Sequence, residues 1–326
     1  MRVEVGYAGT IESEPPSEVR GESLTRRALR RLLHKKIAVA CMAIIGVFYF
    51  VGVFAPWIAP YGYNAQNLDL SFHGPSAHHL FGTDRLGRDI LSRNIYAART
   101  TTIVTLATLA TGFIVLPVTL GLLAGYRGGS VDALINRGGE VLASLPALPM
   151  LILITATLRP RFDDVMAHVE DGIHWHGLVS SGFADYFLIF GALSLFGWVG
   201  GMRLIRAQVL TLRDSEYVLA ARASGASTPR ILRRHLLPNV MPLIIVSASA
   251  SLGAIAGSEV VLTWLGVGVQ APHASYGFLI DEGASRIALQ HHPQLLLVPG
   301  AIIASLIFAF NLLGDALNDV FTPGAR

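Results

Sequence analysis

Apolar and polar residues follow one another in long blocks along this chain, not in the short periods of a soluble fold. A polar stretch covers the first 36 residues, and six predominantly apolar segments come after it: 37–58, 100–125, 141–158, 186–207, 241–264 and 295–314. Each segment is near the ~20 residues that an α-helix needs to cross about 30 Å of hydrocarbon. The pattern predicts an all-α membrane protein with six transmembrane helices.

Two features inside the segments bear on how the helices pack. Pro146 and Pro149 fall in the third segment, which is the shortest. Small residues recur within the segments, as in Gly121 and Gly125. Small residues let helix backbones approach closely where lipid gives no hydrophobic drive, so we expect a tightly packed bundle.

The basic residues lie unevenly on the two sides of the six segments. If the amino terminus is cytoplasmic, 18 of the 25 Lys and Arg lie inside, in residues 1–36, 126–139, 203–238 and the carboxyl-terminal tail. The loops 59–97, 159–185 and 270–294 then hold six on the outside, and Arg99, at the edge of a segment, is counted on neither side. This bias agrees with the positive-inside rule and predicts that both termini are cytoplasmic.

Domain organisation follows from the same blocks. We expect a cytoplasmic tail over 1–36, the first part disordered because it is rich in Glu and Pro, and a six-helix domain over 37–326. The first 30 residues hold no apolar stretch of the kind found in a secretory signal. The external loop would be 59–97, the external insert 159–185, and a long cytoplasmic loop 208–239.

Composition narrows the function class. Apolar residues make up 52% of the chain and charged residues 14%, against about 25% charged in ordinary soluble domains, and the mean hydropathy is +0.52. These values disfavour a soluble enzyme. A net charge of +3 does not indicate a nucleic-acid-binding surface, so no nucleic-acid partner is expected. The single cysteine, Cys41, excludes an intrachain disulfide.

The usual catalytic motifs do not occur. An ATP-binding P-loop needs Gly-Lys followed by Ser or Thr, and neither Lys35 nor Lys36 follows a glycine. There is no His-Glu-x-x-His zinc helix and no Gly-x-Ser-x-Gly elbow. We therefore expect no catalytic residue in this chain. The histidine groups His78-His79, His174-x-His176 and His291-His292 all fall in predicted external loops, and we interpret them as solvated residues, not as a metal site.

The predicted cytoplasmic loop between the fourth and fifth segments carries the most specific pattern. Ser215 can cap a helix whose first turn holds Glu216, and Gly225 suits a left-handed position after that helix. Thr228 would cap a second helix with Pro229 at its first position, ending near Pro238. A loop of this length is unusual for a mere connection, so we expect a short helix pair standing outside the membrane. Its small side chains, Ala220, Ala221 and Gly225, would let a partner's backbone come close.

This loop resembles the EAA loop of ABC-importer permeases. Ala220-Ala221, Gly225 and Leu237-Pro238 match the spacing of that motif, whereas Leu219 and His235 replace its Glu and Ile. Tyr217-Val218, Ala220 to Ala223, Gly225 to Ser227 and Arg234 to Asn239 fit the pattern of the peptide and nickel branch of the family.

Three further motifs agree in order and position. Residues 81–93 resemble the external-loop signature of the second, C-type permease of dipeptide and oligopeptide importers, with Gly82, Asp84, Gly87, Arg88 and Asp89 in it. Residues 259–277 resemble the end of the fifth helix of that family, and residues 310–315 resemble its last helix. The resemblance covers about 30–326.

The resemblance implies a permease subunit of an ATP-driven importer in the bacterial inner membrane, without an ATPase site of its own. Its partners would be a homologous second permease, two cytoplasmic ATPases that bind ATP and Mg, an external substrate-binding protein, and the lipid bilayer; the chain itself would bind no cofactor. The residues expected to couple to the ATPases are Glu216, Tyr217, Ala220, Ala221, Arg222, Gly225, Ala226, Ser227, Arg230 and Pro238.

Two residues at the outer end of the fifth segment, Glu259 and Trp264, are candidates for the translocation path or gate. A charged group inside the bilayer is costly and therefore indicates a function. The alternative for Glu259 is an interfacial carboxylate hydrated by loop water. Asp84, Arg85, Arg88 and Asp89 would form an ion-paired external scaffold.

Alternative functions remain open on the sequence alone. The same importer class could carry nickel or another small solute in place of peptides. A stand-alone secondary transporter or channel would predict internal repeats and would leave the cytoplasmic helix pair unexplained. An intramembrane hydrolase would need a nucleophile and a base facing each other within apolar helices, and these helices offer no histidine partner.

Overall fold

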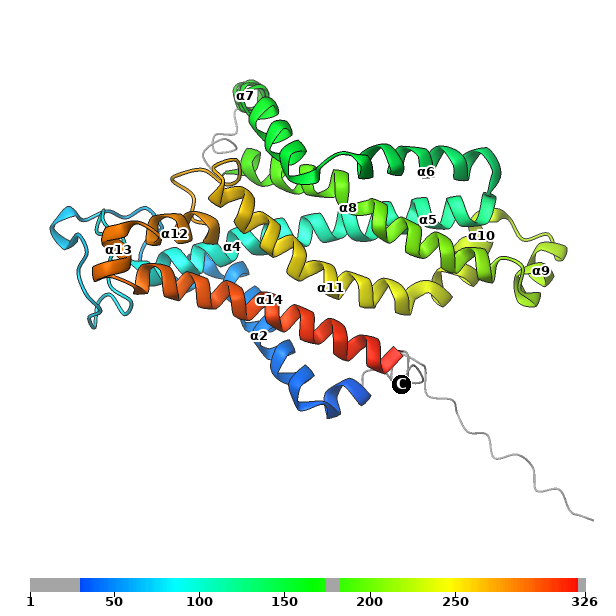
Figure 1. Ribbon diagram of the computed structural model, residues 1–326, viewed down its shortest axis with the longest axis horizontal. Helices are drawn as coiled ribbons and strands as arrows, with labels where there is room; N and C mark the ends of the chain where they lie inside the picture. The colour runs from blue at the N-terminus through cyan, green and yellow to red at the C-terminus, as the bar shows by residue number, and fades with distance from the viewer. Residues whose placement is uncertain (1–29, 174–181, 322–326) are drawn as a thin grey trace, which may run out of the picture.

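The computed structural model describes residues 30–173 and 182–321 as an elongated bundle of helices (Figure 1). The helices are α2 (Lys36–Val53), α3 (Ala55–Ile58), α4 (Ile90–Thr108), α5 (Leu116–Arg127), α6 (Gly129–Ser144), α7 (Ala147–Ile173), α8 (Phe183–Leu212), α9 (Glu216–Ala223), α10 (Thr228–Ile231), α11 (Leu237–Trp264), α12 (Tyr276–Gly283), α13 (Arg286–His291) and α14 (Gln294–Phe321). A 3₁₀ turn, η1 (Leu68–Leu70), precedes α4, and two π-helical stretches, η2 (Leu109–Val115) and η3 (Leu232–Leu236), lead into α5 and α11. The predicted all-α fold is confirmed for these residues, whose one β feature is an isolated bridge between Thr83 and Asp89.

Five continuous helices are long and apolar enough to cross a membrane: Lys36–Val53, Ile90–Arg127, Phe183–Leu212, Thr228–Trp264 and Gln294–Phe321. They cover the predicted segments other than the third. A sixth span is possible if the pair α6 and α7 counts as one. The described chain is thus a polytopic membrane protein with five or six spans.

The third predicted segment, 141–158, is not one straight helix. It straddles a break between α6 and α7, which meet at 89°. Leu145, the residue before Pro146, has φ −85° and ψ 138°. A proline disfavours the helical conformation at the residue before it, which accounts for the break.

The second span begins earlier than its hydropathy indicates. Helix α4 starts at Ile90, ten residues before the predicted start, and runs through η2 into α5 as one helix of 38 residues. The side chain of Asp89 caps this start by accepting the Ser92 N–H at 2.7 Å. Arg93, Asn94 and Arg99 lower the hydropathy of the first turns, so the loop that we predicted over 59–97 ends at residue 89.

The loop predicted over 159–185 is also partly helical. Helix α7 continues to Ile173, with Pro160 inside it, and α8 begins at Phe183. The remainder of that insert, and the tail predicted to be disordered, lie outside the described residues.

Opposite ends of the bundle carry different features. Figure 1 shows α9 and α10 at one end, and α12, α13 and the loop before α4 at the other. The Lys35 ammonium lies 2.9 Å from the Asp319 carboxylate, which places the start of α2 beside the end of α14. The contact places the start of the first span and the end of the last on one side of the bundle, as six spans would require.

Helices α5 and α8 approach each other unusually closely. A Cβ on Gly121 would lie 2.9 Å from Ile205 Cβ and from the Met202 carbonyl oxygen, and one on Gly125 would lie 2.7 Å from Val209 Cβ. The two glycines therefore set the separation of these helices, as the small residues in the sequence indicate.

Candidate functional site

The helix pair between α8 and α11 is joined by a regular C-terminal turn. After α9, Gly225 adopts the left-handed conformation (φ +76°) that its position in the sequence predicts. Its N–H donates to the Arg222 carbonyl at 3.0 Å, and the Ala226 N–H donates to the Ala221 carbonyl at 3.0 Å. These two bonds form a Schellman motif, which ends α9 and fixes the direction of the chain that follows.

The caps of the two helices differ in detail from the sequence prediction. Ser215 occupies the N-cap position of α9, but its hydroxyl donates to the Leu212 carbonyl at 2.6 Å instead of capping the helix. Ser227, not Thr228, is the N-cap residue of α10, and Thr228 and Pro229 open the helix. The prediction was one residue late because Ser and Thr are both good caps and stand side by side here.

The second helix does not end near Pro238, as predicted. It continues through η3 into α11, so that Thr228–Trp264 is one helix of 37 residues. A proline clashes with the carbonyl four residues before it in an α-helix. The π-helical stretch immediately before Pro238, where the Leu237 N–H bonds to the Leu232 carbonyl five residues back, changes that local geometry and lets the helix pass through.

Buried side chains attach this pair to the bundle. Val218 of α9 and Ile231 of α10 are buried in an apolar cluster with Leu122 of α5, Val209 of α8 and Val240 of α11. Burying one such side chain fully is worth about 1.5–3 kcal/mol. The pair therefore packs against the ends of three spans.

Most of the predicted coupling residues lie on the opposite, solvent-facing side of the pair. Glu216, Tyr217, Ala220, Arg222, Gly225, Ser227, Arg230 and Pro238 are exposed, whereas Ala221 and Ala226 are half-buried and pack against the apolar cluster. The surface of small side chains that we predicted is therefore not continuous: Ala220 and Gly225 face the solvent, whereas Ala221 packs against the apolar cluster. The Arg222 guanidinium lies 5.4 Å from the centre of the Tyr126 ring of α5.

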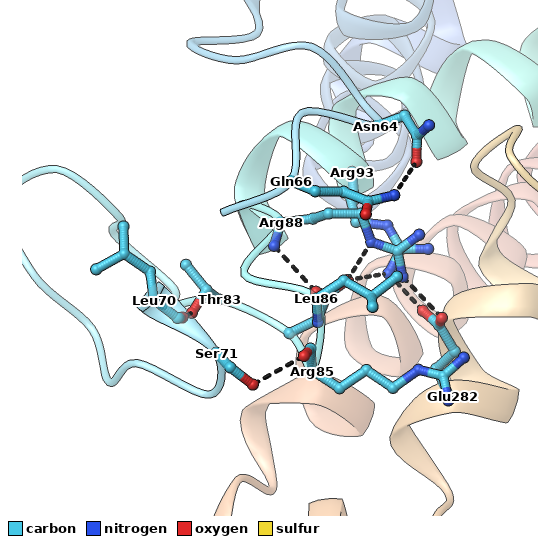
Figure 2. Close-up of polar contacts among 11 residues, drawn as sticks. Asn64, Gln66, Leu70, Ser71, Thr83, Arg85, Leu86, Arg88, Arg93 and Glu282 are labelled. Atoms are coloured by element: carbon cyan, nitrogen blue, oxygen red, sulfur yellow. Dashed lines mark hydrogen bonds and ion pairs between the residues drawn. The ribbon is translucent and has the colours of Figure 1, made fainter. Parts of the chain in front are cut away.

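At the other end of the bundle, the external-loop motif forms a buried ion-pair cluster. The Asp84 carboxylate accepts hydrogen bonds from Arg88 Nε at 2.7 Å and from Arg93 Nη1 at 2.6 Å. Both guanidinium groups also reach Glu282 of α12, Arg88 at 2.8 Å (Figure 2). Two cations and two anions balance, so the cluster can be buried without net charge.

Steric constraints explain why glycine occupies two positions of the motif. Gly82 (φ +80°) and Gly87 (φ +69°) both take left-handed conformations. A Cβ on Gly87 would lie 1.7 Å from the Asn67 carbonyl oxygen, and one on Gly82 would lie 2.5 Å from the His73 carbonyl oxygen. These positions leave no room for a side chain, and the loop can therefore fold back on itself.

The ion-paired scaffold that we predicted from Asp84, Arg85, Arg88 and Asp89 is made of partly different residues in the structure. Arg85 is exposed and makes no ion pair within residues 30–173 and 182–321. Asp89 is used for capping α4 and for a 3.0 Å contact with Nδ1 of His79. Arg93 and Glu282 were missed: Arg93 stands at the end of the motif, but no local pattern links the motif to a residue in α12.

The two candidates for the pathway lie in different environments. Glu259 is fully buried, with its carboxylate 3.1 Å from the Thr101 hydroxyl of α4 and 3.3 Å from the Thr263 hydroxyl. The alternative of an interfacial carboxylate hydrated by loop water does not fit this site, because the carboxyl group is enclosed. In this conformation it joins α4 to α11, and a gating role stays a prediction. Trp264, at the end of α11, is 52% exposed.

The histidines predicted to be solvated are partly engaged in contacts. His79 bonds to Asp89, and the His292 ring stacks on Phe72 at 4.9 Å. His174 and His176 lie outside the described residues. Across the described ranges, no three His, Cys, Asp or Glu side chains stand close enough together to hold a metal ion.

The helices of membrane length, with α9 and α10 between two of them, define a polytopic membrane protein as the class of this chain. Residues 117–326 match the family described as binding-protein-dependent transport system inner membrane component, and residues 23–75 match the N-terminal TM domain of oligopeptide transport permease C. The chain belongs to the first of these families, which spans more than half of its length.

Relatives along nearly the whole chain agree with this assignment. The chain is 36% identical over 304 residues to the dipeptide transport system permease protein DppC of Bacillus subtilis, covering 93% of this chain and 87% of the relative. It is 34% identical to the oligopeptide transport system permease protein OppC of the same organism, covering 93% and 91%. It is 32% identical to OppC of Escherichia coli, covering 95% and 94%. The chain is a multi-pass permease component of the inner membrane.

Proposed function

We propose that this chain is the C-type permease subunit of an ATP-driven importer that moves dipeptides or oligopeptides into the cell. The peptide permeases to which it is similar over more than nine tenths of its length support this substrate class. Both termini would be cytoplasmic, as the distribution of Lys and Arg indicates.

The partners follow from the family to which the chain belongs. A homologous second permease would complete the pathway, and an external binding protein would deliver the peptide. Two cytoplasmic ATPases would bind ATP and Mg and would seat one EAA helix of each permease. This chain would supply no catalytic group and would carry out the movement of the pathway.

The observation that carries the proposal is the attachment of α9 and α10 to the spans. Three residues, 213–215, separate α8 from α9, and no break separates α10 from α11. Because Val218 and Ile231 are buried against the same spans, a displacement of the pair must move the ends of α8 and α11 with it. Tyr217 and Leu219 flank buried Val218 on two different sides of α9 and are 40% and 45% exposed, so each leaves apolar surface open to a partner.

Closure of the ATPases would therefore change the tilt of α8 and α11 and switch the cavity from outward to inward access. Glu216 and Arg230 are placed to pair with a partner's charges, since both are exposed. Arg222 is less free, because Tyr126 holds its guanidinium against the bundle.

Reconstitution of the four-subunit complex with its binding protein tests the proposal. We expect ATP-dependent uptake of a di- or tripeptide, and we expect the variant Leu219→Glu to uncouple uptake while the chain still inserts into the membrane. The matched control for the added charge is Ser224→Glu, at an exposed position directly after α9. A glutamate at an exposed leucine of a span, such as Leu297 of α14, would place the charge within that span and is not a suitable control. Purification of the chain without any ATPase, together with uptake that persists in Leu219→Glu, would contradict coupling.

Import of nickel or another small solute by the same assembly is the alternative. It predicts that the loaded binding protein carries that solute and that peptides do not stimulate the ATPases. A stand-alone secondary transporter would take up substrate without any ATPase.

A further inference from the structure

A small cavity lies at the end of the bundle opposite α9. Its volume is about 160 Å³, and its walls come from the loop after α3 (Tyr63), from α4 (Tyr96 and Arg99), from α8 (Tyr186) and from the loop after α11 (His273). An apolar cavity of about 150 Å³ accommodates a ligand the size of benzene. This space therefore suits one amino-acid residue, not a whole peptide.

The walls are mostly aromatic, and Thr100 links three of the elements that form them. The Tyr63 ring lies 5.2 Å from Tyr96 and is stacked 5.8 Å from the His273 ring. The Thr100 hydroxyl donates to the Ala274 carbonyl at 2.7 Å and lies 3.3 Å from the Tyr186 hydroxyl. Thr100 of α4 thus contacts α8 and the loop after α11, which fixes these three walls of the cavity relative to one another.

Arg99 supplies a positive charge to this cavity without a counter-ion. Its side chain is exposed, and no carboxylate of residues 30–173 or 182–321 pairs with it. The Asp185 carboxylate on α8 is engaged by Arg159 and by the Gln270 N–H at 2.9 Å. Burial lowers the pKa of His273 below its usual value, against the opposing influence of Asp185, and thus favours the neutral form of its ring.

We propose that this cavity binds a carboxylate-bearing residue of the transported peptide, with Arg99 as its counter-charge and the tyrosine rings as its apolar walls. A guanidinium binds a carboxylate through two parallel hydrogen bonds, which gives geometric selectivity as well as attraction. The inference rests on the proposed peptide import, and it assigns a specificity site to this subunit in addition to any on the binding protein.

The location of the cavity connects it with the moving parts. Tyr186 stands in the first turn of α8, and His273 follows the end of α11. The other ends of these two helices carry α9 and α10. A change in the tilt of α8 and α11 therefore alters the cavity walls, so that a peptide held there would be released as the helices move.

Uptake into proteoliposomes that contain the full importer tests the site. The probes are trialanine, its C-terminal amide, and alanyl-glutamyl-alanine amide, each supplied at a concentration that loads the binding protein equally. The variants are Arg99→Gln and Arg99→Lys, and the matched control is Arg85→Gln, an exposed arginine of the external loop that makes no ion pair in the described chain.

We expect Arg99→Gln to lower the rate of trialanine uptake about tenfold relative to that of its amide, with partial recovery in Arg99→Lys and no change in Arg85→Gln. A parallel loss for the glutamyl amide would show that side-chain carboxylates are bound too, and its absence would restrict the site to the peptide C-terminus. An unchanged acid-to-amide ratio in Arg99→Gln, at normal or reduced total uptake, would overturn the proposal. Lack of ATP-dependent uptake of every probe by the unmodified complex would overturn the proposed function itself.

Discussion

The Glu282 carboxylate of α12 accepts a hydrogen bond from Nη2 of Arg88 at 2.8 Å, although 194 residues separate them in the chain. Asp84 and Arg93 complete this buried, charge-balanced group. The contact ties the loop before α4 to the segment between α11 and α14. The end of the bundle that carries α12 is thereby held together by charges, whereas the end that carries α9 is held together by an apolar cluster.

Loss of the Asp84 charge should destabilise the protein strongly. Asp84→Asn leaves two buried guanidinium groups with one carboxylate, and breaking a buried pair in this way costs about 3–5 kcal/mol. Thermal unfolding in detergent would report the loss. Asp69→Asn, an exposed position of the same loop, should unfold like the unmodified chain. Equal unfolding temperatures for the two variants would contradict a stabilising role of the cluster.

A methyl group at Gly87 should be more damaging than one at Gly74. Gly87 combines a left-handed conformation with a carbonyl oxygen 1.7 Å from the Cβ position, whereas nothing lies within 4 Å of a Cβ on Gly74. Gly87→Ala should cost more than the roughly 1–3 kcal/mol of backbone strain alone, because the loop must also move. Protease sensitivity of the external loop measures the effect, and similar cleavage of the Gly74→Ala chain would argue against it.

Substitution of Gly225 should affect transport more than stability. Nothing lies within 4 Å of a Cβ at this position, so the cost is the left-handed backbone, about 1–2 kcal/mol. Gly225→Val should distort the turn between α9 and α10 and lower uptake, with normal membrane insertion. Gly225→Asn should retain most uptake, because Asn tolerates this conformation. Full uptake by Gly225→Val would show that the turn can change shape without consequence.

The contact between α5 and α8 should not tolerate a large residue. Gly121→Leu would push the side chain into Ile205 and the Met202 carbonyl, and overpacking of this kind costs about 1–3 kcal/mol or more. We expect a lower yield of assembled complex on size-exclusion chromatography. Gly46→Leu, where nothing lies within 4 Å, serves as the control on an open surface of α2. Normal assembly of the Gly121 variant would mean that the helices can separate.

Acid should destabilise the fold through His273. Its pKa is lowered in the folded chain because of burial, so below about pH 6.5 the unfolded chain binds a proton that the folded chain does not. The stability contributed by this residue is complete above pH 6.5 and is lost as the pH falls toward the lowered pKa. The unfolding temperature of His273→Gln should consequently depend less on pH between 7 and 5 than that of the unmodified chain. Identical pH profiles would exclude a contribution from this residue.

The local parts of this architecture are predictable from the sequence because their causes are local. Apolar blocks of membrane length indicate the spans, and Gly225 indicates the left-handed turn. The bend between α6 and α7 has a local cause at Pro146, yet hydropathy alone joins the two sides into one segment. The start of α4 was missed for a similar reason, since buried Arg93 lowers the hydropathy of a helix that a distant carboxylate stabilises.

Contacts between residues that are far apart in the sequence could be found only in the structure. No spacing connects Glu282 with Arg88, and no pattern brings Tyr63, Arg99 and His273 to one cavity. Glu259 illustrates the limit most clearly. Its position along a span was correctly inferred, but its enclosure depends on Thr101 of another helix, which hydropathy cannot reveal.

The uninterrupted helix from Thr228 to Trp264 imposes a constraint on how this chain can change. At 1.5 Å per residue its 37 residues span roughly 55 Å, well beyond the hydrocarbon layer. Inserting or deleting one residue anywhere between Ile231 and Glu259 would rotate one end by about 100° relative to the other. Glu259 would then leave Thr101, or Ile231 would leave its apolar pocket. The number of residues in this helix is thus fixed by the directions in which Ile231 and Glu259 must point, and not by the thickness of the membrane.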